Sequence, residues 1–168
     1  MQAGNAFEKL QQFSNEKKGW LFGHFSYDLK NETEQLHSLH HDGIGFPDLH
    51  FFEPEIVLEL FAGSLRIHSY EDPRGIFATL LSFPSTISTT SAKRIDIKNR
   101  IQRSGYIDIV EKLKSHIARG DGYEINFCQE FFAENVLLQP VEVYSKLSVV
   151  SPNPFSALYK LNDKYCIC

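Results

Sequence analysis

Apolar residues recur at helical spacing in several parts of the chain. The clearest pattern covers residues 104–119, where five apolar side chains fall at positions i, i+3, i+4, i+7 and i+11 and so share one helix face. Gly120 follows this pattern as a helix stop. A second helix is predicted over 141–150, after Pro140, which suits a first helical turn. Weaker helical patterns cover residues 7–13, 28–39 and 76–81.

Runs of alternating or aromatic residues predict strands between these helices. A hairpin is expected over residues 50–70, and a second over 155–168 with its turn at Asn162-Asp163. Further strands are predicted over 19–27 and 123–132. Hairpins mixed with helices in this way indicate an α+β protein.

Changes in composition divide the chain into three regions. Residues 1–83 carry α+β patterning, residues 84–103 are Ser/Thr-rich and then basic, and residues 104–168 return to helices and strands. We expect the middle region to be a connector. Between positions 93 and 119, eight Lys or Arg accompany three acids. This basic stretch predicts either a contact with an anionic ligand or partner, or a solvated linker and helix face.

Composition and charge exclude several classes of protein. With 42% hydrophobic and 23% charged residues, the chain is not disordered. A net charge of -4 and an isoelectric point near 6.0 argue against nucleic-acid binding. No apolar run is long enough to span a membrane. Three cysteines without a secretory signal predict reduced thiols in a cytoplasmic protein.

Two cysteines, Cys166 and Cys168, lie on the last predicted strand, where both thiols point to the same face. We interpret them as small buried residues, because free cysteines are commonly buried and no further metal ligands lie near them in the sequence. His40, His41 and Asp42 form a ligand-like cluster that we interpret as a solvated loop. The sequence therefore predicts no metal site.

Candidate chemistry lies in residues 120–129, which are predicted to be a helix stop, a tight turn and a strand. Glu124 and Asn126 are two residues apart and would project to the same side of that strand. If this side faces a cleft, the Glu124 carboxylate can accept a proton or orient a nucleophile, and the Asn126 amide can bind a ligand. The alternative is a strand surface that faces solvent.

Three motifs, in this order, resemble those of the chorismate-binding enzymes. Residues 19–29, GWLFGHFSYDL, resemble the G-x-x-G-x-x-[SG]-Y-D-L strand of that family. Residues 120–129, GDGYEINFCQ, resemble its G-D-x-Y-Q-x-N-x-x-Q segment. Residues 151–157, SPNPFSA, resemble its N-P-[ST]-P-[FY]-x-[AF] motif.

This resemblance implies an α+β fold of the anthranilate synthase component I type, with an antiparallel β-sandwich-type core flanked by helices and incomplete in this chain. Residues 1–83 would be the N-terminal region of such a synthase, and residues 104–168 the start of its chorismate-binding catalytic region. The full-length enzyme is expected to bind chorismate with Mg²⁺ and to receive ammonia from a glutamine amidotransferase subunit. The family's catalytic lysine and Mg²⁺-binding glutamates would follow residue 168, so we expect this fragment to bind no cofactor.

Within the family, Tyr123 and Asn126 resemble the para-aminobenzoate branch, aminodeoxychorismate synthase component I. Anthranilate synthases more often carry an apolar residue at position 126. The resemblance thus implies amination of chorismate to 4-amino-4-deoxychorismate, with Glu124, which replaces the family's Gln, facing C4 of the substrate ring. Anthranilate synthase component I is the alternative, and a non-catalytic module that docks an amidotransferase or binds an aromatic ligand is another.

The third motif resembles a segment that lines a tryptophan-binding regulatory pocket in some family members. Its residues are Ser151, Pro152, Asn153, Pro154, Phe155 and Ser156. Ser151 stands where the family usually has Asn, and Asn153 where it usually has Ser. A plain corner between a helix and a strand is the alternative interpretation.

The aromatic content is high, with 14 Phe and 7 Tyr, and many of these residues fall on predicted strands. We interpret them as the inner face of a sandwich whose other half is absent. The last predicted strand also reaches the final residue. We therefore expect an N-terminal fragment of a longer enzyme, inactive by itself, whose open sheet edges promote self-association.

Overall fold

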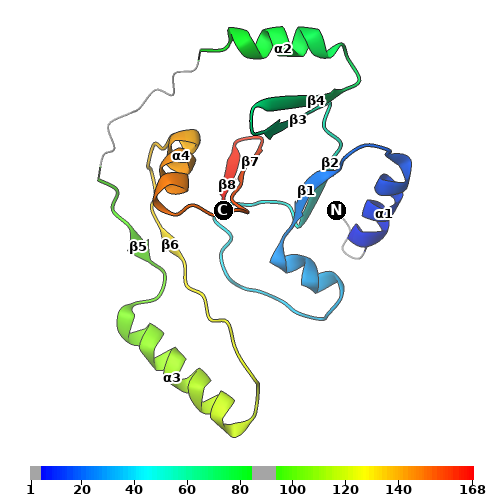
Figure 1. Cartoon of the computed structure of the whole chain (residues 1–168). Coiled ribbons are helices and arrows are strands. Elements are labelled where there is room, and N and C mark those ends of the chain that lie inside the picture. Colours follow the sequence, from blue (N-terminus) through cyan, green and yellow to red (C-terminus); the bar gives the residue numbers. More distant parts are fainter. Residues whose placement is uncertain (1–4, 85–93) are drawn as a thin grey trace. The chain divides into compact units, whose positions relative to one another are not determined.

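The computed structural model describes residues 5–84 and 94–168 (Figure 1). The described residues combine helices with small antiparallel sheets, which confirms the α+β prediction. The strands of the described residues form four two-stranded sheets. Residues 85–93 of the predicted connector lie outside the described residues.

Two compact units make up the chain. Unit 1 is Met1–Thr86 with Lys160–Lys164, and unit 2 is Ile87–Tyr159 with Tyr165–Cys168. The elements of Met1–Thr86 are α1 (Ala6–Glu16), β1 (Phe22–Phe25), the 3-10 helix η1 (Tyr27–Glu32), β2 (Leu49–Phe52), β3 (Ile56–Phe61), β4 (Ser64–Ser69) and α2 (Pro73–Ser82). They are followed by β5 (Lys98–Asn99), α3 (Arg103–Arg119), β6 (Phe131–Phe132), α4 (Pro140–Val150), β7 (Leu158–Leu161) and β8 (Lys164–Ile167).

Aromatic and imidazole rings hold β1 against β2 in unit 1. The strands are antiparallel, with Phe22 opposite Phe52 and His24 opposite His50. The Phe22 and Phe52 ring centroids are 6.3 Å apart, and a contact of this kind between aromatic rings contributes about 0.5–1.5 kcal/mol. The His24 and His50 ring centroids are also 6.3 Å apart. A Cβ at Gly23 would lie 2.0 Å from the His50 carbonyl oxygen, so the strands can approach this closely only because position 23 is glycine.

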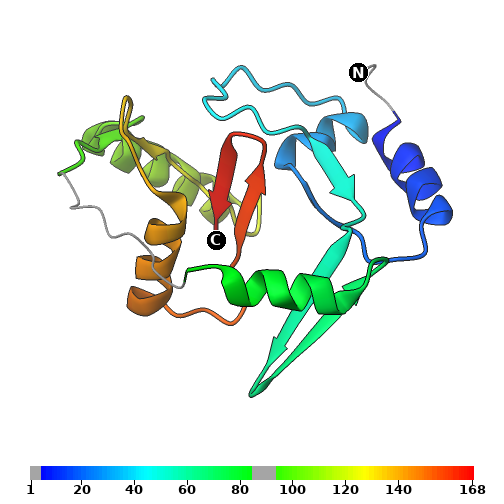
Figure 2. The ribbon, with the colours of Figure 1, turned by 90° about the horizontal axis from the view of Figure 1, so that it is seen from above.

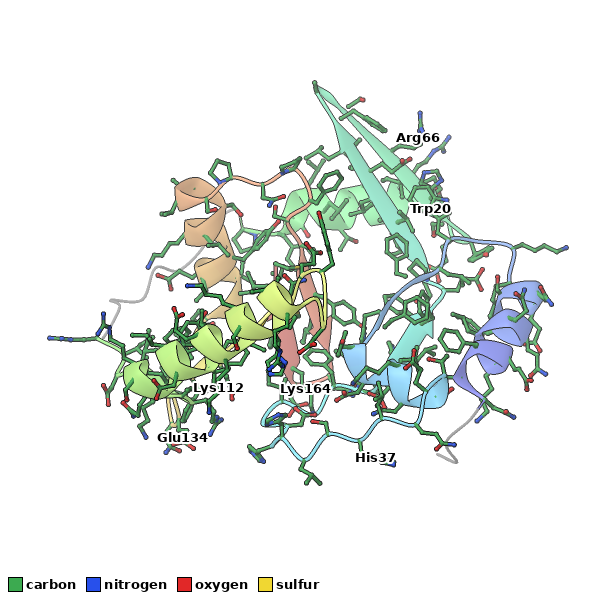
Figure 3. The ribbon with its side chains drawn as sticks, turned by 90° about the horizontal axis from the view of Figure 1, so that it is seen from below. Trp20, His37, Arg66, Lys112, Glu134 and Lys164 are labelled. Atoms are coloured by element: carbon green, nitrogen blue, oxygen red, sulfur yellow. The ribbon has the colours of Figure 1, made fainter. Side chains whose placement is uncertain are left out.

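The β3–β4 hairpin has the turn and alternation that the sequence predicts, and Figure 2 shows its two strands running side by side. Glu59 lies opposite Arg66. Its Oε2 accepts a hydrogen bond from Arg66 Nη1 at 3.3 Å and lies 2.6 Å from His68 Nε2. The hydrogen bond with His68, assisted by the Arg66 charge, holds the pKa of Glu59 below its ordinary value. Trp20 packs on His68 with ring centroids 5.5 Å apart, and Figure 3 shows Trp20 near the hairpin that carries Arg66.

The helix predicted over residues 28–39 is wrong. Only the 3-10 helix η1 forms, and the chain from Glu34 to Asp48 has no regular helix or strand. The apolar residues there are Leu29, Leu36 and Leu39, and residues 30–35 between the first two are all polar, so the apolar helix face is interrupted. Leu29 is buried, whereas Leu39 is fully exposed.

Few side chains are buried in either unit. Leu29, 5% exposed, is the one buried apolar residue within the described ranges. Large apolar side chains remain in contact with solvent in strands and in irregular segments, including Leu60 at 84% and Tyr123 at 95% exposure. Two-stranded sheets have only marginal stability unless other elements cover them. No helix in the described ranges is long and apolar enough to cross a lipid bilayer.

Candidate functional site

The candidate segment, residues 120–129, begins where α3 ends. Gly120 has φ +83°, a left-handed conformation that glycine adopts at little cost. Its N–H donates to the Ile117 carbonyl at 3.0 Å, and the Asp121 N–H donates to the His116 carbonyl at 3.1 Å. This pair of bonds is a Schellman motif, which satisfies two carbonyls of the last helical turn. The predicted helix stop at Gly120 is therefore confirmed.

Asp121 ties the turn after α3 back to the helix. Its Oδ2 accepts a hydrogen bond from Arg119 Nε at 3.2 Å and lies 2.7 Å from His116 Nδ1. Arg119 first, and then His116, hold the pKa of the Asp121 carboxyl below its ordinary value. The sequence pattern does not predict this cluster, although the three residues lie within one helical turn and its stop.

The strand predicted over residues 123–132 is wrong for most of its length. Only Phe131 and Phe132 form a strand, β6, which pairs with β5. A strand requires a neighbour for its backbone groups, and β5 offers two residues, followed by Arg100, whose N–H donates to the Glu130 carbonyl at 2.9 Å. The alternating faces that were expected to orient the candidate residues are therefore absent before β6.

Glu124 and Asn126 are both exposed within the candidate segment. No hydrogen bond or ion pair within residues 5–84 and 94–168 restrains either side chain. Their exposure leaves both accessible to a ligand, and nothing in the described residues fixes the direction in which they act. Their catalytic and substrate-binding roles stay predictions.

Gln129 is a further polar residue of the same motif, and it was not among the predicted site residues. Its Oε1 is buried and, among the described residues, has no hydrogen-bond partner. Buried side-chain amides normally have such a partner. The neighbouring Phe127 packs on Tyr106 of α3 with ring centroids 5.2 Å apart, which holds this part of the segment against the helix. The family motif ends on a Gln at this position, and that match could have marked Gln129 as a candidate site residue.

The residues predicted to resemble a regulatory pocket form a corner between α4 and β7. The Ser151 N–H donates to the Leu147 carbonyl at 2.8 Å and closes the helix. Asn153 Oδ1 accepts a hydrogen bond from the Phe155 N–H at 2.8 Å, which shapes the turn. Ser156 Oγ lies 3.3 Å from Tyr144 Oη. These hydrogen bonds explain the shape of the corner without a ligand. Ligand binding at this corner stays a prediction.

The cysteines of the last strand are not buried as predicted. Cys128, Cys166 and Cys168 are all free and exposed. Among the described residues, β8 has only β7 as a strand neighbour, so little covers its side chains. Partial burial, followed by the charge of Cys168 and a hydrogen bond with its thiol, raises the pKa of the Cys166 thiol.

Ion pairs neutralise much of the basic stretch before and within α3. Lys98 pairs with Glu134 at 3.3 Å, and Arg100 Nε donates to Glu130 at 2.7 Å. Figure 3 shows Lys112 on α3 and Glu134 after β6. This arrangement fits the interpretation of a solvated linker and helix face.

The chain belongs to the family of chorismate binding enzymes, whose family model matches residues 1–168. It is 25% identical over 156 residues to anthranilate synthase component 1 of Thermus thermophilus, covering 86% of this chain and 34% of that protein. It is 23% identical over 181 residues to aminodeoxychorismate synthase component 1 of Bacillus subtilis, covering 96% of this chain and 38% of that protein. The chain thus spans about a third of the length of these relatives. No solved structure shows significant similarity.

Proposed function

We propose that this chain is the N-terminal portion of an aminodeoxychorismate synthase component I of folate biosynthesis, located in the cytoplasm. The observation that carries this choice of branch is the polar Asn126 three residues after Tyr123, where anthranilate synthases more often have an apolar residue. The family match over the whole chain and the likeness to the Bacillus subtilis protein support it.

In the proposed reaction, ammonia attacks C4 of chorismate and the C4 hydroxyl leaves as water, which gives 4-amino-4-deoxychorismate. The Glu124 carboxylate would accept hydrogen bonds from the N–H groups of the nucleophile, and a charged acceptor strengthens such bonds. A carboxylate also repels the two carboxylates of chorismate, so Glu124 must lie on the C4 side of the substrate. The Asn126 amide would donate to a ligand oxygen or accept from a ligand hydroxyl.

Two further components belong to this proposal. A glutamine amidotransferase subunit would supply the ammonia. Mg²⁺ is expected for the full-length enzyme, but no group of three or more His, Cys, Asp or Glu in the described ranges is arranged to hold a metal ion. The described residues therefore do not fit Mg²⁺, and we assign no step of the reaction to it here.

A deletion of the gene that encodes this chain tests the proposal in its own organism. We expect growth of the deletion strain on minimal medium to be restored by para-aminobenzoate and not by tryptophan. Restoration by tryptophan alone would replace the proposal with its second candidate, anthranilate synthase component I. That candidate is favoured by several relatives, among them the 26% identical protein of Mycolicibacterium smegmatis.

A binding module without catalysis is the remaining alternative. Calorimetric titration of the chain with chorismate, tryptophan and the amidotransferase distinguishes it from the synthase. Tight binding of tryptophan or the amidotransferase by the chain alone, together with a deletion strain that needs no supplement, would favour the module. A need for para-aminobenzoate would exclude it.

A further inference from the structure

We propose that Cys166 and Cys168 form a two-thiolate binding site for a soft monovalent metal cation such as copper(I). The two residues lie on either side of Ile167 at the end of β8, so their side chains point to the same face of the strand. Both are exposed and neither is in a disulfide.

The hairpin fixes the backbone that carries these thiols. Ala157 and Cys168 exchange two backbone hydrogen bonds, of 2.7 Å from the Ala157 N–H and 3.0 Å from the Cys168 N–H. Cys168 Sγ also donates to the Ala157 carbonyl at 3.8 Å. At the other end of the hairpin, Asn162 adopts a positive φ of 54° in the turn, which asparagine tolerates better than most residues. The pairing register of β7 with β8 is thus fixed at the turn and at the open end of the hairpin, which holds the backbone of both cysteines in place.

The spacing of the two residues favours a bridging cation over a disulfide. Two residues along a strand advance about 6.4–6.8 Å, whereas a disulfide requires Cβ atoms about 3.5–4.5 Å apart. A disulfide would therefore break the β7–β8 ladder. A cation with metal–sulfur bonds of about 2.3 Å, the length known for zinc, joins sulfurs about 4.6 Å apart in a linear arrangement, which rotation of the side chains can reach.

The number of ligands selects the class of cation. Structural zinc sites use four ligands, and no group of three or more His, Cys, Asp or Glu in the described part of the chain is arranged to hold a metal. Soft thiolates select copper(I) among the common alternatives, and this ion accepts two-coordinate sites.

Cys128 provides a matched control within the chain. It is exposed like the other two cysteines, and it lies in the candidate segment rather than on a strand. No second sulfur contacts it within the described residues. If copper(I) binds to any exposed thiol without a specific site, loss of Cys128 should weaken binding as much as loss of Cys166 or Cys168.

The test is an anaerobic copper(I) titration of the chain against a chromophoric copper(I) chelator, with the variants C128S, C166S and C168S. We expect the unmodified chain and C128S to take one copper(I) per chain, and C166S and C168S to bind at least tenfold more weakly. Unchanged affinity in C166S, or an equal loss in C128S, would overturn the proposal. One copper per two chains, with dimers in sedimentation, would overturn the intrachain site.

Alkylation of the unmodified chain gives a readout that does not depend on how the variants fold. With copper(I) bound, we expect mass spectrometry to find Cys128 alkylated and both Cys166 and Cys168 protected in the same molecules. Equal alkylation of all three cysteines would contradict the site. A Cys166–Cys168 disulfide formed readily by a mild thiol oxidant would contradict the spacing argument.

Discussion

Individual side chains fix the turn that leads into the candidate segment. Gly120 stops α3 because it adopts a left-handed conformation, and Asp121 then accepts hydrogen bonds from the helix it follows. The stop could be predicted because a glycine after an amphipathic pattern is a local signal. The Asp121 cluster was missed because its charges look like ordinary solvated residues until the turn brings them together.

The pKa of Asp121 depends on Arg119. We expect Arg119→Gln to raise this pKa toward the ordinary value of 3.8, because the first of its two supporting partners is lost. Because folding lowers this pKa, the associated stability is present above the unfolded-state pKa and is lost as the pH falls through the folded-state value. NMR titration of the Asp121 carboxyl measures the change. Lys112→Gln, which removes a charge from the same helix away from Asp121, should leave the pKa unaltered.

Glu124 offers a residue-level test of the proposed chemistry. In a full-length, active enzyme carrying this segment, we expect Glu124→Ala to lower the amination rate by about 10- to 100-fold. A positioned general acid or base typically contributes about 100- to 10,000-fold, so this expected loss reaches only the lower end of that range. Glu124→Gln restores the family's residue and should retain most activity. Glu134→Gln is the matched control, since it removes an exposed carboxylate outside the candidate segment. An amination rate unchanged in Glu124→Ala would refute the assigned role.

At the scale of elements, helices and hairpins with short-range patterns were predictable. The periodicity of α3 and α4 and the turns of β3–β4 and β7–β8 are local. The pairing of β1 with β2 and of β5 with β6 was missed because about 30 residues separate the partners, and such pairing depends on the whole fold rather than on neighbouring residues. The same dependence explains why residues 123–130 did not become a strand.

The two glycines at positions 75 and 120 allow a paired test of element stability. A Cβ at either position would meet no atom within 4 Å, so only backbone conformation decides the effect. Gly120→Ala forces a left-handed alanine and should destabilise the end of α3 by about 1 kcal/mol. Gly75→Ala, inside α2, should stabilise that helix by about 0.5–1 kcal/mol. Amide hydrogen exchange of the two helices measures both; a shift of the same sign in each would contradict the expectation.

At the scale of the whole molecule, exposed apolar side chains dominate both units. The sequence already indicated that the aromatic residues need a further covering surface, and the exposure of Tyr123 and Phe155 agrees with that interpretation. The candidate residues Glu124 and Asn126 are exposed in the same way. The geometry of a substrate site could not be predicted from these residues, because the described residues do not enclose them.

We expect the isolated chain to bind a hydrophobic fluorescent dye strongly and to associate as its concentration rises, because its apolar surface is uncovered. Dye titration and size-exclusion chromatography measure this behaviour. Leu60→Ser, on exposed β3, should lower dye binding, whereas Leu29→Ser should raise it by opening the buried position. A monomer at high concentration with weak dye binding would be inconsistent with the expectation.

The packing of Trp20 makes this residue an intrinsic fluorescence probe of unit 1. The chain has one tryptophan, and its ring lies 6.0 Å from Phe22 and 5.5 Å from His68, centroid to centroid, with half of the residue exposed. Its emission therefore reports on a single place, where the segment leading into β1 meets the β3–β4 hairpin. Separation of the hairpin would move the indole into water and shift the emission to longer wavelength. Folding of unit 1 can thus be followed without a label and separately from α3 and α4.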